Sequence, residues 1–86
     1  DYALFQNYPN PFNPSTNISF SLPKETRVSL KIYDVLGNEV LSLVNDVRNA
    51  GTHTVTFDAN SFSNGVYFYK LETPDFTKTS KMILMK

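Results

Sequence analysis

Apolar and polar residues alternate with a period of two along most of this chain. The alternation is cleanest over residues 17–22, 27–34, 52–57 and 66–73. Successive side chains of a β-strand point to opposite faces of a sheet, so the pattern predicts a strand in each range. The alternate residues expected to share one face are Ile18, Phe20 and Leu22; Val28, Leu30 and Ile32; His53, Val55 and Phe57; and Tyr67, Tyr69 and Leu71.

Residues 39–47 are also apolar but break the period of two. Their apolar positions are Val40, Leu41, Leu43, Val44 and Val47. This spacing is compatible with a strand that contains a β-bulge and also with a helical turn.

A last strand is predicted over residues 78–85, and polar turns separate the strands. The link Lys24-Glu25-Thr26 is short, which predicts antiparallel pairing of the strands before and after it. Asn49-Ala50-Gly51 and Pro74-Asp75 are further turns, and the loop over 58–65 is expected to cross from one sheet to the other. On the last strand, we expect Met82 and Leu84 on one face and Lys81, Ile83 and Met85 on the other.

The first 16 residues form a different kind of segment. Pro9, Pro11 and Pro14 each lack a backbone donor and restrict the residue before them, which excludes a helix or a central strand. Tyr8 and Phe12 are large rings on this stiff segment, so we expect a strap that lies across one end of the core. A first short strand is expected near its beginning.

These elements predict an all-β antiparallel sandwich of about seven strands. With 86 residues, of which 41% are hydrophobic and 14% aromatic, the chain is expected to be one domain with a modest, ring-rich core. We divide it into a Pro-rich strap with a first short strand (1–16) and a sandwich core (17–86). Because it starts at Asp1 without a leader, we expect a piece of a longer protein.

Charge and composition exclude several classes of function. The formal net charge is zero, so there is no basic excess to neutralise the phosphates of a nucleic acid. The chain has no cysteine, which excludes disulfides and thiolate metal sites. No apolar run approaches the roughly 20 residues that span a bilayer.

Catalytic and metal-binding patterns are absent. His53 is the single histidine and has no cysteine or second histidine to join it, so we interpret it as a half-buried strand residue. Asp46, Asp58 and Asn60 do not have the spacing of a calcium loop and are better explained as turn caps. We therefore expect no enzyme and no cofactor.

Two positions carry specific expectations about backbone geometry. Gly37 is expected to adopt a positive φ in the turn after residue 33, with Asp34 capping the backbone of that turn. Tyr67 is expected to be the corner tyrosine of the sandwich, with its hydroxyl bonded to the preceding loop.

Four motifs occur in order along the chain. They are Tyr-Pro-Asn-Pro with Pro9 and Pro11, Asp-x-x-Gly-x-x-Val with Asp34, Gly37 and Val40, Gly-x-Tyr with Gly65 and Tyr67, and a Lys-flanked apolar ending from Lys81 to Lys86. Together they span nearly the whole chain. In these motifs the chain resembles the C-terminal sorting domain of proteins exported by the type IX secretion system of Bacteroidetes.

The resemblance implies an immunoglobulin-like sandwich that serves as the sorting signal of an N-terminal cargo domain. It implies transit through the periplasm, recognition by an outer-membrane translocon, and then a location at the cell surface or outside the cell. A sortase-like surface peptidase commonly removes such a domain. The four motifs would be the recognition elements, and we hypothesise that the translocon reads residues 81–86, with strand addition as one means. Lysine at a sheet edge also protects against unwanted strand pairing, and this second explanation of Lys81 and Lys86 stays open.

Two other functions remain open. One is a carbohydrate- or cell-surface-binding sandwich appended to a hydrolase, with Tyr33 or Phe68 as an exposed platform. The other is a structural spacer. A sorting domain must lie at the C-terminus, whereas a binding module or spacer can lie anywhere, so the ending at Lys86 favours sorting.

Overall fold

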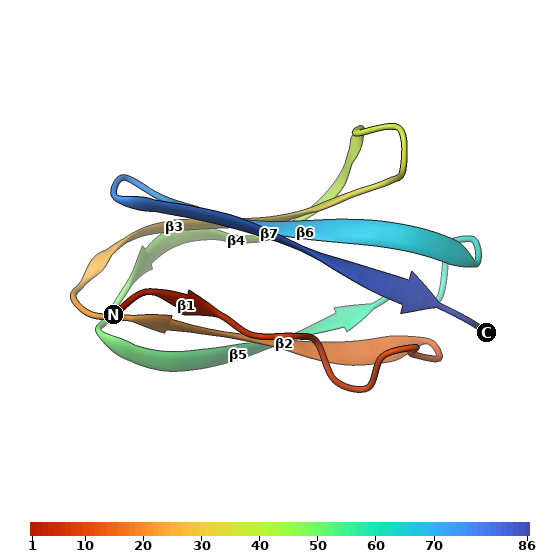
Figure 1. Cartoon of the computed structure of the whole chain (residues 1–86), viewed down its shortest axis with the longest axis horizontal. Coiled ribbons are helices and arrows are strands. Elements are labelled where there is room, and N and C mark those ends of the chain that lie inside the picture. Colours follow the sequence, from red (N-terminus) through yellow and green to blue (C-terminus); the bar gives the residue numbers. More distant parts are fainter.

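The computed structural model describes residues 1–86 as two antiparallel β-sheets that face each other (Figure 1). The strands are β1 (Ala3–Leu4), β2 (Ser15–Leu22), β3 (Thr26–Tyr33), β4 (Glu39–Arg48), β5 (Gly51–Asp58), β6 (Gly65–Thr73) and β7 (Phe76–Leu84). Their order is β1-β2-β5 in the three-stranded sheet and β4-β3-β6-β7 in the four-stranded sheet. The predicted all-β sandwich of about seven strands is confirmed. The structure contains no helix long and apolar enough to cross a membrane.

The prediction that the strands on either side of residues 24–26 pair with each other is wrong. Strand β2 pairs with β5, whereas β3 pairs with β4 and β6 in the opposite sheet. A link of three residues reaches about 10 Å, which matches the spacing of packed sheets, so a short link permits a crossing as well as a hairpin. The chain also crosses between the sheets from β4 to β5 and from β5 to β6, and these crossings give the immunoglobulin-like arrangement.

The core lies between the two sheets and is built from the alternate apolar residues. Its members are Leu4, Phe12, Ile18, Phe20, Leu22, Val28, Leu30, Ile32, Val44, Phe57, Ala59, Tyr67, Tyr69, Leu71, Met82 and Leu84. Each large apolar side chain that is fully buried contributes about 1.5–3 kcal/mol relative to exposure. His53 is half-buried and stacks on Phe20, with ring centroids 5.3 Å apart, as expected of a strand residue.

Strand β4 resolves the irregular pattern of residues 39–47. Its pairing with β3 shifts register twice: Leu30 pairs with Val44 and Lys31 with Ser42, and a second shift follows Ile32. Each shift leaves one extra residue on β4, which is a β-bulge. The segment is therefore a bulged strand and not a helical turn, and the extra residues explain why its apolar side chains do not alternate.

The Pro-rich part of the N-terminal strap lies at the end of the sandwich far from the N-terminus (Figure 1). Phe12 is 1% exposed and its ring lies 5.9 Å from that of Phe57. Tyr8, in contrast, is 79% exposed, so the expectation that both rings cover the core holds for Phe12 alone. The strap also pairs with the ends of two strands, through bridges from Tyr8 to Asn17 and from Phe12 to Leu84.

Candidate recognition site

The turn between β3 and β4 is held by its own backbone and by one carboxylate. The Asp34 N–H donates to the Asn38 carbonyl and the Gly37 N–H donates to the Asp34 carbonyl, each at 3.0 Å. Oδ1 of Asp34 accepts from the N–H groups of Leu36 (2.9 Å) and Asn38 (3.0 Å). Gly37 has a φ of +86°, a conformation that favours glycine. The expected roles of Asp34 as cap and Gly37 as turn glycine are confirmed.

This rigid turn presents apolar side chains to solvent. Val35 is 63% exposed, Leu36 is 82% exposed and Val40 is 38% exposed, and none of the three belongs to the core. Turn residues are usually polar, so two adjacent aliphatic side chains at the end of a turn are not explained by folding. We call Val35 and Leu36 the turn tip.

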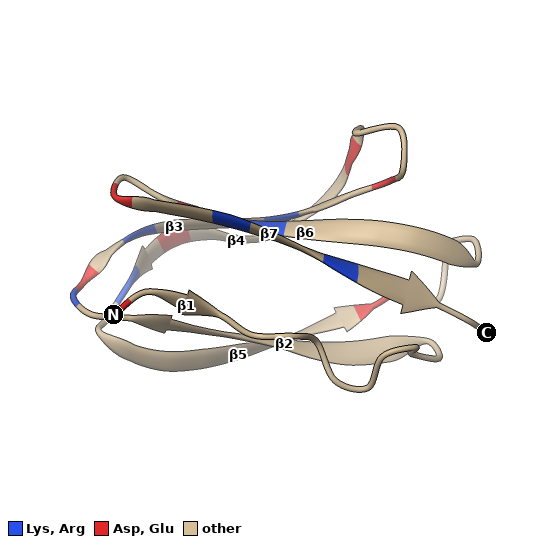
Figure 2. Cartoon of the chain, viewed as in Figure 1, with Lys and Arg blue, Asp and Glu red and all other residues tan.

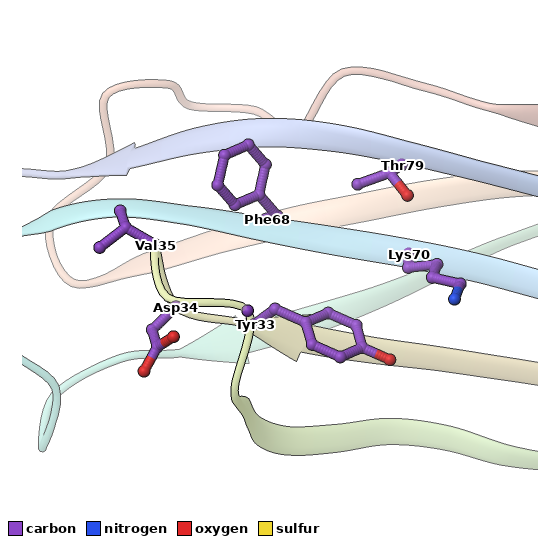
Figure 3. Close-up of a pocket in the computed structure, with 7 residues that line it drawn as sticks. Tyr33, Asp34, Val35, Phe68, Lys70 and Thr79 are labelled. Carbon is purple, nitrogen blue, oxygen red and sulfur yellow. The ribbon is translucent and has the colours of Figure 1, made fainter.

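A shallow depression of about 290 Å³ lies beside the turn on the outer face of the four-stranded sheet. It is lined by Tyr33, Asp34, Val35, Gly37, Phe68, Lys70 and Thr79. Figure 3 shows Phe68 and Tyr33 standing on neighbouring strands, with Val35 next to them. The first two residues of the Asp-x-x-Gly-x-x-Val motif, Asp34 and Gly37, therefore line a surface that contains two aromatic rings.

The sheet register places Lys81 on the same face. Tyr33 pairs with Phe68, and Phe68 pairs with Lys81, so the three residues form one row across β3, β6 and β7. Directly opposed residues of antiparallel strands point to the same face, and neighbouring strands are about 4.8 Å apart. The backbone of Lys81 is therefore about 10 Å from that of Tyr33. The structure brings the last motif next to the turn motif, which the sequence spacing did not indicate.

The Gly-x-Tyr motif lies at the start of β6, where it stabilises the fold. Gly65 begins β6 with a φ of +146°, and Tyr67 is 8% exposed. The Tyr67 hydroxyl donates to the Ser63 carbonyl at 2.7 Å. The expected bond from a corner tyrosine to the preceding loop is confirmed, and this motif points into the sandwich.

The strap is fastened by buried polar groups that the sequence analysis did not identify. Asn7 is 2% exposed; its N–H donates to the Tyr69 hydroxyl at 2.9 Å and its Nδ2 donates to Thr16 Oγ1 at 3.0 Å. Thr16 in turn donates to the Pro9 carbonyl at 2.9 Å. Burial raises the pKa of the Tyr69 hydroxyl. The only sequence signal was a hydroxyl on an otherwise apolar strand face, which must find a partner when buried.

The strap also covers much of the free edge of β7. The Phe12 N–H donates to the Ile83 carbonyl and the Met85 N–H donates to the Phe12 carbonyl, each at 3.0 Å. The Asn10 side chain accepts from the Ile83 N–H at 3.0 Å, and Gln6 Nε2 donates to the Lys81 carbonyl at 3.0 Å. These are the groups that an added strand would need, so strand addition over residues 81–85 requires removal of the strap.

The remaining predicted positions lie at the surface. Pro9 and Pro11 are exposed on the strap. Lys86 is exposed and tied to the β5–β6 loop, because its N–H donates to Asn64 Oδ1 at 2.8 Å and its Nζ donates to the Asn60 carbonyl at 3.2 Å. No group of three or more His, Cys, Asp or Glu side chains is placed to hold a metal ion. The Asp58 carboxylate accepts from the Asn60 N–H at 3.0 Å, as expected of a turn cap.

Comparison with known families decides what kind of domain this is. Residues 6–85 match the family described as "Secretion system C-terminal sorting domain". The chain belongs to this family. The resemblance of its four motifs to C-terminal sorting domains is therefore confirmed, and the family is in general one of non-catalytic signals.

Among solved structures, the sorting domain is similar to PorZ, described as an essential bacterial surface component of the type-IX secretion system of Porphyromonas gingivalis. The TM-score is 0.65 at 20% sequence identity, and the match covers 98% of this chain but 12% of that one. At this identity the likeness establishes the fold. Comparison with curated proteins gave no significant match.

Proposed function

We propose that this sorting domain directs an N-terminally joined cargo across the outer membrane by type IX secretion. The family match over residues 6–85 is the observation that carries the proposal. In this proposal the parent protein crosses the periplasm, the outer-membrane translocon recognises the domain, and the cargo reaches the cell surface or the medium. Removal of the domain by a sortase-like surface peptidase belongs to the same proposal, and the domain itself does no chemistry.

The geometry suits a recognition domain more than a catalytic one. The depression beside the turn is open, and its residues offer no nucleophile with an adjacent base. The termini lie at opposite ends of the long axis (Figure 1), so a cargo joined at Asp1 is held away from the end that carries the β3–β4 turn and the Pro-rich part of the strap. In this proposal the export machinery can therefore contact that end without contacting the cargo.

Export of a fusion protein tests the proposal. A signal peptide, a fluorescent protein and residues 1–86 are expressed in a host with type IX secretion, and fluorescence is measured in periplasmic, surface and medium fractions. We expect fluorescence at the surface or in the medium. The matched control carries an unrelated β-sandwich in place of the domain and is expected to stay in the periplasm. Retention of the sorting-domain fusion in the periplasm would refute the proposal.

Deletion of residues 81–86 is a poor test of recognition. It removes Met82 and Leu84, which are 0% and 1% exposed, together with the groups that fasten Phe12. The truncated domain would lose core packing before it lost a contact surface. Substitutions of exposed side chains on the complete chain separate the two effects.

Carbohydrate binding is the second candidate. Tyr33 and Phe68 line the same depression, and aromatic faces bind sugar rings by stacking. A shallow site of this kind supports weak binding at most. A glycan array with the isolated domain tests it, and saturable binding that is lost in Phe68→Ala would favour this function over sorting.

A further inference from the structure

The turn tip displays two adjacent large aliphatic side chains to solvent on a backbone that hydrogen bonds hold in place. Four hydrogen bonds hold residues 34–38, two of them to Asp34 Oδ1. Val35 and Leu36 gain little from burial within the chain, since they are 63% and 82% exposed. A surface whose conformation is fixed before binding loses little entropy when it docks. These are the properties of an anchor that enters a pocket on another molecule.

Ion pairs on the neighbouring surface leave one cation, Lys81, without a partner. Lys31 pairs with Glu39 at 3.3 Å and Lys70 pairs with Glu72 at 4.0 Å. Lys81 forms no ion pair, and the register places it in the row that contains Tyr33 and Phe68. The surface beside the turn tip therefore combines apolar groups with a single unmatched cation.

A protein fits this surface better than a lipid membrane does. Binding at a membrane surface depends on a wide apolar face and on clustered basic residues. Figure 2 shows acidic segments on both arms of the β3–β4 turn and no basic segment on the turn itself. Those segments are Asp34 and Glu39. Glu39 is paired with Lys31, whereas the Asp34 carboxylate forms no ion pair and would be repelled by an anionic lipid surface.

We propose that Val35 and Leu36 insert into an apolar pocket on a protein partner, and that a carboxylate at the rim of this pocket pairs with Lys81. The inference rests on the proposed sorting function and names the surface by which the export machinery holds the domain. Tyr33 and Phe68, which line the depression beside the turn, contact the rim of the partner's pocket in this arrangement.

The test uses the fluorescent fusion with the complete domain. Val35→Ser/Leu36→Ser removes the anchor, and Leu36→Lys is a second, single change at the most exposed position. Lys81→Glu reverses the free cation. We expect each variant to export at least 10-fold less fluorescence than the parent, while its urea unfolding midpoint, measured on the isolated domain, stays at the parental value.

Two control variants match these changes. Val47→Ser replaces an aliphatic residue of β4 that is 54% exposed and lies at the other end of the strand. Lys78→Glu reverses an exposed lysine of β7 that pairs with the core residue Leu71 and so lies on the opposite face from Lys81. Both controls are expected to be exported like the parent.

The possible failures are distinguishable. Retention of the parent fusion in the periplasm overturns the sorting function, and the inference with it. Normal export of the parent and of the turn-tip variants overturns the inference alone. Two further measurements test for other binding partners of the turn tip. Co-sedimentation of the domain with anionic vesicles that is lost in Val35→Ser/Leu36→Ser indicates a membrane. Self-association that is lost in the same variant indicates a second copy of the chain. Either result overturns the proposal.

Discussion

The backbone N–H of Asn7 donates to the hydroxyl of Tyr69 at 2.9 Å, across 62 residues of sequence. The same hydroxyl donates to the Phe5 carbonyl at 2.8 Å. Tyr69 is fully buried on β6, so one side chain of the four-stranded sheet holds two backbone groups of the N-terminal strap. Because the strap in turn covers the edge of β7, this contact joins the two ends of the chain into one folded unit.

Tyr69→Phe should destabilise the domain by about 1–3 kcal/mol, because it leaves the buried N–H of Asn7 without an acceptor. Urea unfolding measures the loss. Tyr33→Phe is the control, since Tyr33 is half-buried on the outer face and should change stability by less than about 0.5 kcal/mol. Equal stabilities of Tyr69→Phe and the parent would show that the hydroxyl does not fasten the strap.

Stability should fall at alkaline pH through the same hydroxyl. Burial raises the pKa of Tyr69 above its ordinary value of 10.0, so the folded chain holds this proton more tightly than the unfolded chain does. The stabilisation is complete below pH 10 and is lost as the pH rises through the folded-state pKa. Unfolding free energies measured from pH 8 to 11 should decline more steeply in the parent than in Tyr69→Phe. Parallel profiles would contradict the assignment.

Gly37→Val should destabilise the domain by about 1–3 kcal/mol through backbone strain. A Cβ at this position would meet no atom within 4 Å, so the loss comes from the φ of +86° and not from a clash. Gly37→Asn should be milder, because asparagine tolerates positive φ better than a β-branched residue does. Thermal unfolding of the two variants gives the comparison, and an equal loss in both would point to packing instead.

Tyr67→Phe should cost about 0.5–1.5 kcal/mol, the usual net contribution of one hydrogen bond, because the hydroxyl donates to Ser63 at 2.7 Å. Hydrogen exchange of the amides in residues 59–64 should also quicken, since the bond holds this loop. An unchanged loop and an unchanged unfolding midpoint would argue against the corner-tyrosine role.

Phe12→Ala should cost about 3–5 kcal/mol, because Phe12 is 1% exposed and lies between the two sheets. Tyr8→Ala changes a ring that is 79% exposed on the same strap and should leave stability unchanged. Chemical unfolding of the two variants separates a strap that completes the core from one that only lies over it. Similar stabilities of the two variants would exclude the first possibility.

Much of the fold could be predicted from local patterns. The face on which Ile32 or Tyr69 lies follows from the strand period, and the geometry of Gly37 and Asp34 follows from turn chemistry within five residues. The bulges of β4 could not be located, because a bulge depends on how β4 pairs with β3. The pairing of β2 with β5 also escaped prediction, because a link of three residues can form a hairpin or cross between sheets.

The amino-acid sequence alone determined the class of the domain, the inner face of most strands, and the motifs by which the family is recognised, because each depends on residues that are neighbours in the chain. Tertiary structure decided that Asn7 reaches Tyr69, that the strap covers the edge of β7, and that Lys81 lies in one row with Phe68 and Tyr33. These relationships join residues tens of positions apart, and their distances are set by sheet register and packing, which no local pattern of side chains specifies.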